Sequence, residues 1–113
     1  MLVTSDIADW TFGQLGLAYD QLRTRSPSAE ELVLMRERSP STFSCSVKCP
    51  SLVMLGTQDL RVHHSQGLYW SNLLKSAGAA VKVMLFPDAN HGLETADSEK
   101  FGFLAIHNFL IQN

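Results

Sequence analysis

Apolar residues in the second half of the chain form two short, uninterrupted runs about one helix length apart. The first run covers residues 51–55, after Pro50, and ends at Gly56, while the second covers Val81–Phe86. Unbroken apolar runs of this length are typical of parallel strands that are covered on both faces. The pattern therefore predicts two buried strands, the second of them followed by a polar turn over residues 87–90.

The segments between and after these runs show helical spacing. Residues 65–77 place Leu68, Leu73 and Leu74 at intervals that suit one helix face, and Gly78 follows as a common helix stop. A second helix is expected from Asp97 onward, and its apolar residues wrap most of it, which predicts that it is largely buried. These residues are Phe101, Leu104, Ala105, Ile106, Phe109 and Leu110. A strand, a helix and a second strand form a parallel β-α-β unit, so the fold class is α/β.

The first forty residues have a different character. Ser28 and Glu31 have the spacing of a capping box, which predicts a helix that begins there and stops at Ser39-Pro40. A chain of 113 residues without internal repeats is one domain at most. We therefore expect a single domain over residues 1–113, in which residues 1–40 are mostly helical and residues 41–113 form a β-α-β-α unit.

Composition excludes several function classes. The chain has nine Lys and Arg against eleven Asp and Glu, with no basic cluster, which argues against nucleic acid or an anionic membrane as a partner. Its apolar runs are far shorter than the roughly 20 residues of a membrane span, and the N-terminus lacks signal-peptide features, so we expect a cytoplasmic protein. Cys45 and Cys49 have no second pair of metal ligands at zinc-site spacing, which favours reduced thiols over a metal site.

The residues that follow the two predicted strands are the candidates for chemistry, since in parallel sheets sites gather beyond the carboxyl ends of the strands. Asp59 follows the first strand and His91 the second. A carboxylate that accepts from one ring nitrogen leaves the other nitrogen as a general base, so this pair is two thirds of a hydrolase triad. The alternatives are that Asp59 serves only in a turn or as a helix cap, and that His91 is a solvated loop residue. His63, His64 and His107 are weaker candidates: the first two are adjacent and so lack helical metal-ligand spacing, and His107 is expected in a packed helix.

A family resemblance strengthens this interpretation. The chain is similar to the end of the catalytic domain of the prolyl-oligopeptidase-family serine peptidases, and most like their acylaminoacyl-peptidase branch, also called acyl-peptide hydrolases. The similarity is carried by residues 5–10, 39–40, 47–52, 56–62 and 91–92. The resemblance implies the C-terminal portion of an α/β-hydrolase fold, with Asp59 as the triad acid and His91 as the triad histidine. It further implies hydrolysis of short N-acylated peptides without a cofactor or metal.

The nucleophile of such a triad is missing from the sequence. No Gly-x-Ser-x-Gly motif occurs among the 113 residues, and in the resembled family that serine would fall before Met1. Ser65 is expected to be only the cap of the helix that follows it. Two departures from the family pattern, Ala8 and His63 in place of proline, do not touch the pair. We therefore expect the chain alone to be inactive, as a fragment or a natural remnant of a longer peptidase.

Two other functions stay open at this point. One is a non-catalytic α/β module for binding or assembly, and the other is a part of a different α/β-hydrolase, such as a carboxylesterase. Under any of these functions, two strands with apolar edges offer free backbone groups to another chain. We expect a homo-oligomer that forms through the exposed sheet edge or by exchange of the N-terminal residues, where Trp10, Phe12, Leu15 and Leu17 need a surface to pack on.

Overall fold

The computed structural model describes residues 28–113, and the order of elements in it agrees with the predicted strand, helix, strand and helix. The elements are α3 (Ala29–Glu37), the 3-10 helix η2 (Pro40–Ser46), β1 (Ser51–Gly56), α4 (His64–Ser76), β2 (Val81–Phe86) and α5 (Ala96–Gln112). The second predicted strand has the observed bounds, and the first is one residue longer than predicted. The expectations for Trp10, Phe12, Leu15 and Leu17, and for the helical content of residues 1–27, fall outside the described residues.

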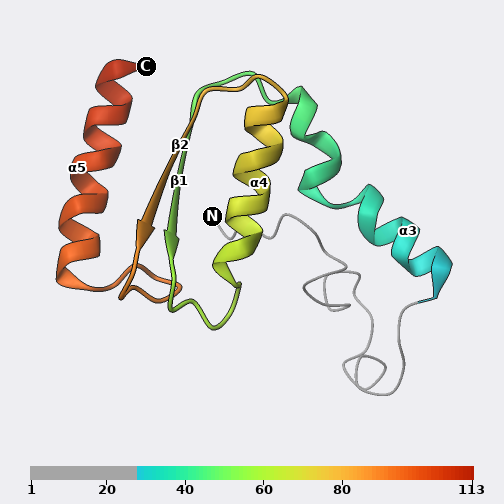
Figure 1. Cartoon of the computed structure of the whole chain (residues 1–113), viewed down its shortest axis with the longest axis horizontal. Coiled ribbons are helices and arrows are strands. Elements are labelled where there is room, and N and C mark those ends of the chain that lie inside the picture. Colours follow the sequence, from blue (N-terminus) through green and yellow to red (C-terminus); the bar gives the residue numbers. More distant parts are fainter. Residues whose placement is uncertain (1–27) are drawn as a thin grey trace.

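Strands β1 and β2 form a parallel pair whose residues are matched one to one along the full length of both strands. Ser51 lies opposite Val81 at one end, and Gly56 lies opposite Phe86 at the other. Helix α4 carries the chain from the end of β1 back to the start of β2, as a parallel connection requires (Figure 1). Both strands consequently end at the same edge of the sheet, and the segments that follow them lie together.

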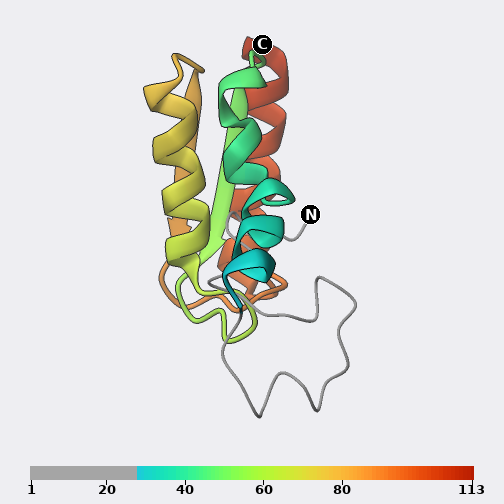
Figure 2. The same ribbon diagram turned by 90° about the vertical axis from the view of Figure 1, so that its right-hand side faces the viewer.

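The two long helices lie on opposite faces of the strand pair, which gives three layers (Figures 1 and 2). Helix α4 packs closely on one face because Gly67 lies against Leu55, where any side chain at position 67 would overlap the leucine. Leu74 of the same helix is 1% exposed and is one of the largest fully buried side chains among the described residues. Helix α5 covers the other face and contributes Gly102 and Ala105 to the buried side.

The predicted burial of the last helix was wrong. Phe101, Leu104, Ile106 and Leu110 are exposed, and the buried positions of α5 are small, namely Ser98, Gly102 and Ala105. The two described strands present a narrow surface, so only one stripe of the helix touches them. The strands show the same limit: two residues of β1 and one of β2 are buried, and the others are half-buried or exposed, rather than covered on both faces as predicted.

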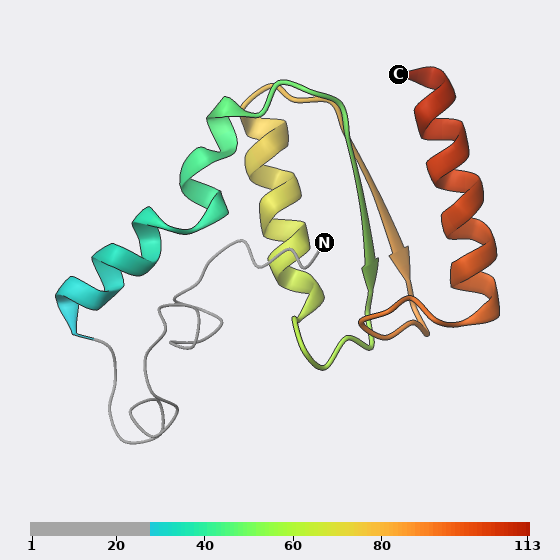
Figure 3. The same ribbon diagram turned by 180° about the vertical axis from the view of Figure 1, so that it is seen from behind.

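Of the N-terminal described elements, η2 lies beside α4 on the side away from the strands, and α3 leads away from it (Figure 3). Helix α3 begins with the predicted capping box, in which the Ser28 hydroxyl accepts from the Glu31 N–H at 3.2 Å. Helix α3 ends at Glu37, before the predicted stop at Ser39-Pro40, and Pro40 begins η2, a 3-10 helix that the sequence pattern did not predict. No helix among residues 28–113 has the length and apolar character needed to cross a bilayer.

Candidate active site

Asp59 is held by the turn that follows β1. Its Oδ1 atom accepts hydrogen bonds from the backbone N–H groups of Arg61, at 2.8 Å, and Val62, at 2.9 Å. Bonds from an Asp side chain to N–H groups two and three residues ahead are typical of Asx turns. The Val62 side chain is buried and anchors the turn. One carboxylate oxygen is therefore fixed by the backbone, and Oδ2 is left for another partner.

His91 is held by the segment between β2 and α5. The Leu93 N–H donates to the Asn90 carbonyl at 3.2 Å, and the Ser98 hydroxyl donates to the Leu93 carbonyl at 2.6 Å. Leu93 has a φ of 53°, a left-handed conformation that costs a non-glycine residue about 1–2 kcal/mol. These bonds hold the loop in that conformation and attach it to the first turn of α5.

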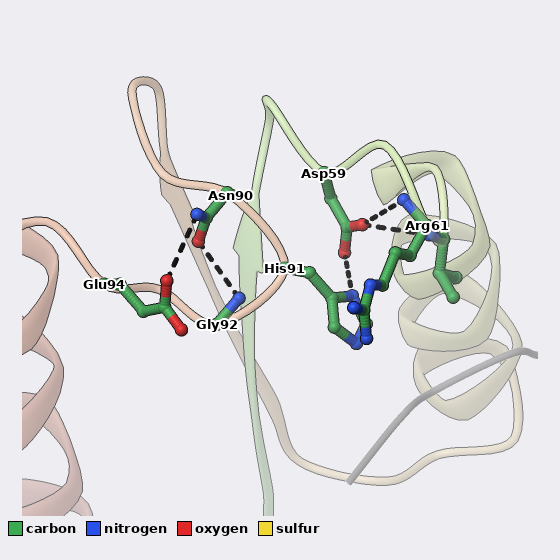
Figure 4. Close-up of polar contacts among 7 residues, drawn as sticks. Asp59, Arg61, Asn90, His91, Gly92 and Glu94 are labelled. Carbon is green, nitrogen blue, oxygen red and sulfur yellow. Dashed lines mark hydrogen bonds and ion pairs between the residues drawn. The ribbon is translucent and has the colours of Figure 1, made fainter.

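The two side chains meet across the ends of the strands (Figure 4). His91 Nδ1 lies 2.6 Å from Asp59 Oδ2, a short hydrogen bond of the kind that a charged acceptor favours. Because a carboxylate only accepts, the ring nitrogen is the donor, which leaves Nε2 of the neutral ring with a free lone pair. The predicted contact between residues 32 positions apart is confirmed.

Asp59 is suited to remain charged. Partial burial raises the pKa of its carboxyl, but the Val62 N–H, the His91 ring and the Arg61 N–H outweigh this effect and hold the pKa below its ordinary value. Its side chain is 12% exposed and that of His91 is 26% exposed, so the pair is partly shielded from water while the ring stays accessible. An anionic Asp59 orients the imidazole and stabilises its protonated form.

The loop after β1 and the loop after β2 approach each other closely, and this contact positions Asp59 next to His91. The Thr57 N–H donates to the Phe86 carbonyl at 3.0 Å, and the Gln58 N–H donates to the Ala89 carbonyl at 3.0 Å. Gly56, which comes just before the two donors, lies so near the carbonyls of Ala89 and Asn90 that a side chain would overlap them. Glycine is therefore required at this position for the loops to pack together.

Asp59 and His91 line a cavity of about 590 Å³ that runs along all of β1. The hydroxyl side chain among its described lining residues belongs to Ser51, at the opposite end of that strand. Six residues of strand at about 3.3 Å each place Ser51 far beyond reach of the ring. The structure thus brings an imidazole and a carboxylate together, and among the described residues that line this cavity no hydroxyl lies near the ring.

The other candidate residues take different places. His63 and His64 line the same cavity, with ring centroids 4.3 Å apart. His63 caps α4 by accepting from the Ser65 N–H at 3.3 Å, so the expected capping role of Ser65 was wrong. The reason is that α4 begins at His64, one residue earlier than predicted. His107 is exposed on α5, outside the residues that line this cavity.

Three contributors to the site were not predicted from the sequence. Gly56 was seen only as the end of a strand, and the backbone N–H groups of Arg61 and Val62 were not recognised as partners of Asp59. The spacing of an Asx turn was available as a signal for the two N–H groups. Nothing in the local sequence signals the approach of Gly56 to Ala89, because that contact joins two loops more than thirty positions apart.

Comparison with known proteins finds relatives in sequence and in structure. The acylamino-acid-releasing enzyme of Arabidopsis thaliana is 42% identical over 108 residues, which cover 94% of this chain and 14% of that enzyme. The solved structure of Pyrococcus horikoshii acylaminoacyl peptidase has a TM-score of 0.57 at 27% identity and covers 80% of this chain and 14% of its own. Thermogutta terrifontis esterase 2 has a TM-score of 0.54 at 20% identity, over 85% of this chain and 40% of its own, which shows the fold alone.

These likenesses define the fold and the lineage. The parallel strands with helices on both faces belong to an α/β-hydrolase fold, as predicted, and the chain spans about one seventh of the length of the Arabidopsis relative. The family profile described as the prolyl oligopeptidase family matches residues 3–113. Because this match covers almost the whole sequence, the chain belongs to the prolyl oligopeptidase family.

Proposed function

We propose that this chain is the part of an acylaminoacyl-peptidase-like serine hydrolase that supplies the acid and the base of its triad. The observation that carries the proposal is the 2.6 Å contact between Asp59 and His91 at the ends of two parallel strands. Membership of the prolyl oligopeptidase family supports a peptidase over a non-catalytic module or a carboxylesterase. The nucleophilic serine comes from outside these 113 residues.

The chemistry follows from the free nitrogen of His91. The serine hydroxyl gives its proton to Nε2 while its oxygen attacks the carbonyl of an N-acylated terminal residue. Asp59 stabilises the imidazolium ion that forms, and His91 then gives the proton to the leaving amine. Water, activated by the same nitrogen, releases the acyl-amino acid from the serine. These steps use no cofactor and no metal.

The substrate class and the setting are parts of the same proposal. The names of the relatives support short N-acylated peptides as substrates. We place the peptidase in the cytoplasm and expect copies to associate through an exposed sheet edge. Outside the β1 and β2 pair, the described residues add no further strand to the sheet, which supports an edge that is open to a partner.

A chimera tests the catalytic roles. Residues 3–113 would replace the matching stretch of the Arabidopsis enzyme, and hydrolysis of an acetyl-alanine anilide would be measured. We expect measurable turnover and labelling by a fluorophosphonate, and a loss of about 10³-fold or more in kcat for His91→Ala. Asp59→Asn is expected to lower kcat by a similar order, because the ring then loses its orientation.

His107→Ala is the matched control, because that histidine is exposed on α5 away from the cavity. Its chimera should keep the parent chimera's kcat within about twofold. A folded chimera without activity, or one in which His91→Ala and His107→Ala behave alike, would contradict the assignment. The isolated chain should neither turn over the anilide nor react with the fluorophosphonate.

A further inference from the structure

Asn90, which comes directly before His91, holds the loop that carries the imidazole. Both backbone N–H groups that follow His91 donate to Asn90. The Gly92 N–H donates to its side-chain Oδ1 at 3.1 Å, and the Leu93 N–H donates to its backbone carbonyl at 3.2 Å. Leu93 has a left-handed φ of 53°, which a leucine does not adopt by preference, so the turn depends on hydrogen bonds. The two bonds to Asn90 therefore fix the direction in which the backbone presents His91.

The other end of the Asn90 amide is held by Glu94. The Asn90 Nδ2 group donates to Glu94 Oε2 at 3.4 Å. Glu94 reaches back across Gly92, where a Cβ atom would overlap the Glu94 carboxylate, so glycine at position 92 leaves room for this contact. Figure 4 shows these bonds on one side of the loop and the His91 ring on the other, toward Asp59. Asn90, Gly92 and Glu94 thus form a clamp, the Asn90 clamp, on the loop that presents the imidazole.

The backbone of Asn90 also connects the clamp to the end of β1. The Asn90 carbonyl lies against Gly56, where a side chain would overlap it. The Gly56 carbonyl in turn accepts the Asp59 N–H at 3.3 Å. The contact therefore joins the turn that carries Asp59 to the loop that carries His91, and a shift of Asn90 moves one side chain relative to the other.

We propose that Asn90 is a positioning residue for the base of the reaction, because its amide keeps the His91 ring in hydrogen-bonding position against Asp59. Asn90 and Glu94 are outside the set of residues that line the cavity beside the pair, so their effect on turnover passes through His91. Both side chains are exposed, so neither of them fills the core. The inference rests on the proposed peptidase function and adds a residue that orients its histidine.

Removal of the Asn90 amide is the first test, in the chimera described above and by NMR of the 113-residue chain. Asn90→Ala removes both side-chain bonds and should lower the kcat of the chimera by about tenfold or more, since a small misplacement of a catalytic group is costly. KM should stay within about twofold, because the residues that line the cavity are unchanged. In the isolated chain, the downfield ring proton of His91 should shift or weaken as its bond to Asp59 loosens.

Exchange of donor and acceptor is the second test. Asn90→Asp keeps the acceptor for the Gly92 N–H but sets a second carboxylate against Glu94, and should lower kcat by about tenfold at neutral pH. Glu94→Gln keeps an oxygen that accepts from Asn90 and should lower kcat by no more than about threefold. The double variant Asn90→Asp/Glu94→Gln exchanges the donor and the acceptor, and its net charge is that of the wild type. We expect its kcat within about threefold of wild type, together with recovery of the His91 ring proton.

Asn72→Ala is the matched control, since Asn72 is exposed on α4 and does not line the cavity. It should change neither kcat nor the ring proton. Asn90→Ala that lowers only the free energy of unfolding, with kcat and the ring proton unchanged, would refute positioning, as would a double variant no better than Asn90→Asp. An inactive wild-type chimera would instead refute the peptidase proposal. The ring proton of the isolated chain would then still decide the role of Asn90, because that measurement needs no activity.

Discussion

Gly56 and Ala89 lie against each other so closely that the backbone at position 56 has no room for a side chain. This contact brings the loop after β1 against the loop that carries His91. Gly56→Ala should push the loops apart, lengthen the 2.6 Å contact between Asp59 and His91, and destabilise the fold by about 1–3 kcal/mol. The measurements are urea unfolding and the downfield proton resonance of the His91 ring, which should weaken or vanish.

Gly102→Ala should have the opposite effect on stability. Gly102 lies inside α5, and a methyl group there would meet the Met54 sulfur at 3.9 Å, an ordinary contact. Alanine in a helix interior is favoured over glycine by about 1 kcal/mol, so we expect a gain of roughly that size in urea unfolding. Both variants add one methyl group. A comparable loss of unfolding free energy in the two would therefore contradict the steric requirement for glycine at position 56.

Asp59→Asn should remove the anchor of the His91 ring. A charge-assisted hydrogen bond contributes about 1.5–3 kcal/mol, so this variant should lower the free energy of unfolding by roughly that amount at neutral pH. The downfield ring proton should also disappear. Glu99→Gln is the control, on an exposed carboxylate in the first turn of α5, and should change the free energy by no more than about 0.5 kcal/mol.

The effect of Asp59→Asn should depend on pH in a defined direction. The pKa of Asp59 is lower in the folded chain than its ordinary value, which is about 3.9 in an unfolded chain. Its contribution is therefore fully present above roughly pH 4 and is lost as the pH falls through the lower, folded pKa. Unfolding at about pH 7, 5 and 3 should show the wild type and the variant converging only at the lowest pH. A difference that stays constant would contradict the lowered pKa.

The two long helices should respond differently to truncation of a large side chain. Leu74 on α4 is 1% exposed, so Leu74→Ala should destabilise the fold by about 2–5 kcal/mol through the cavity it leaves. Phe103 on α5 is 73% exposed, so Phe103→Ala should stay within about 0.5 kcal/mol. Thermal unfolding of both variants tests this, and a large loss for Phe103→Ala would show that the outer side of α5 is covered after all.

Local patterns were sufficient for the strands and the α-helices, though not for η2, and for the identity of the paired residues Asp59 and His91. The apolar runs predicted both strands to within one residue, and the Ser28 capping box marked the start of α3. Asp59 and His91 were found because parallel strands end at a common edge, so position along the chain already implied proximity. Each of these features depends on neighbours within a few residues or on the directions of two strands.

The tertiary structure decided what depends on contacts between distant segments. The exposure of Phe101 and Leu104 follows from how narrow a surface the strands offer to α5, and periodicity reports which residues are apolar, not what covers them. The need for glycine at position 56 arises only when the Ala89 carbonyl arrives from another loop. Helix spacing likewise cannot distinguish His63 from Ser65 as the cap, since that choice depends on which N–H groups the first turn leaves free.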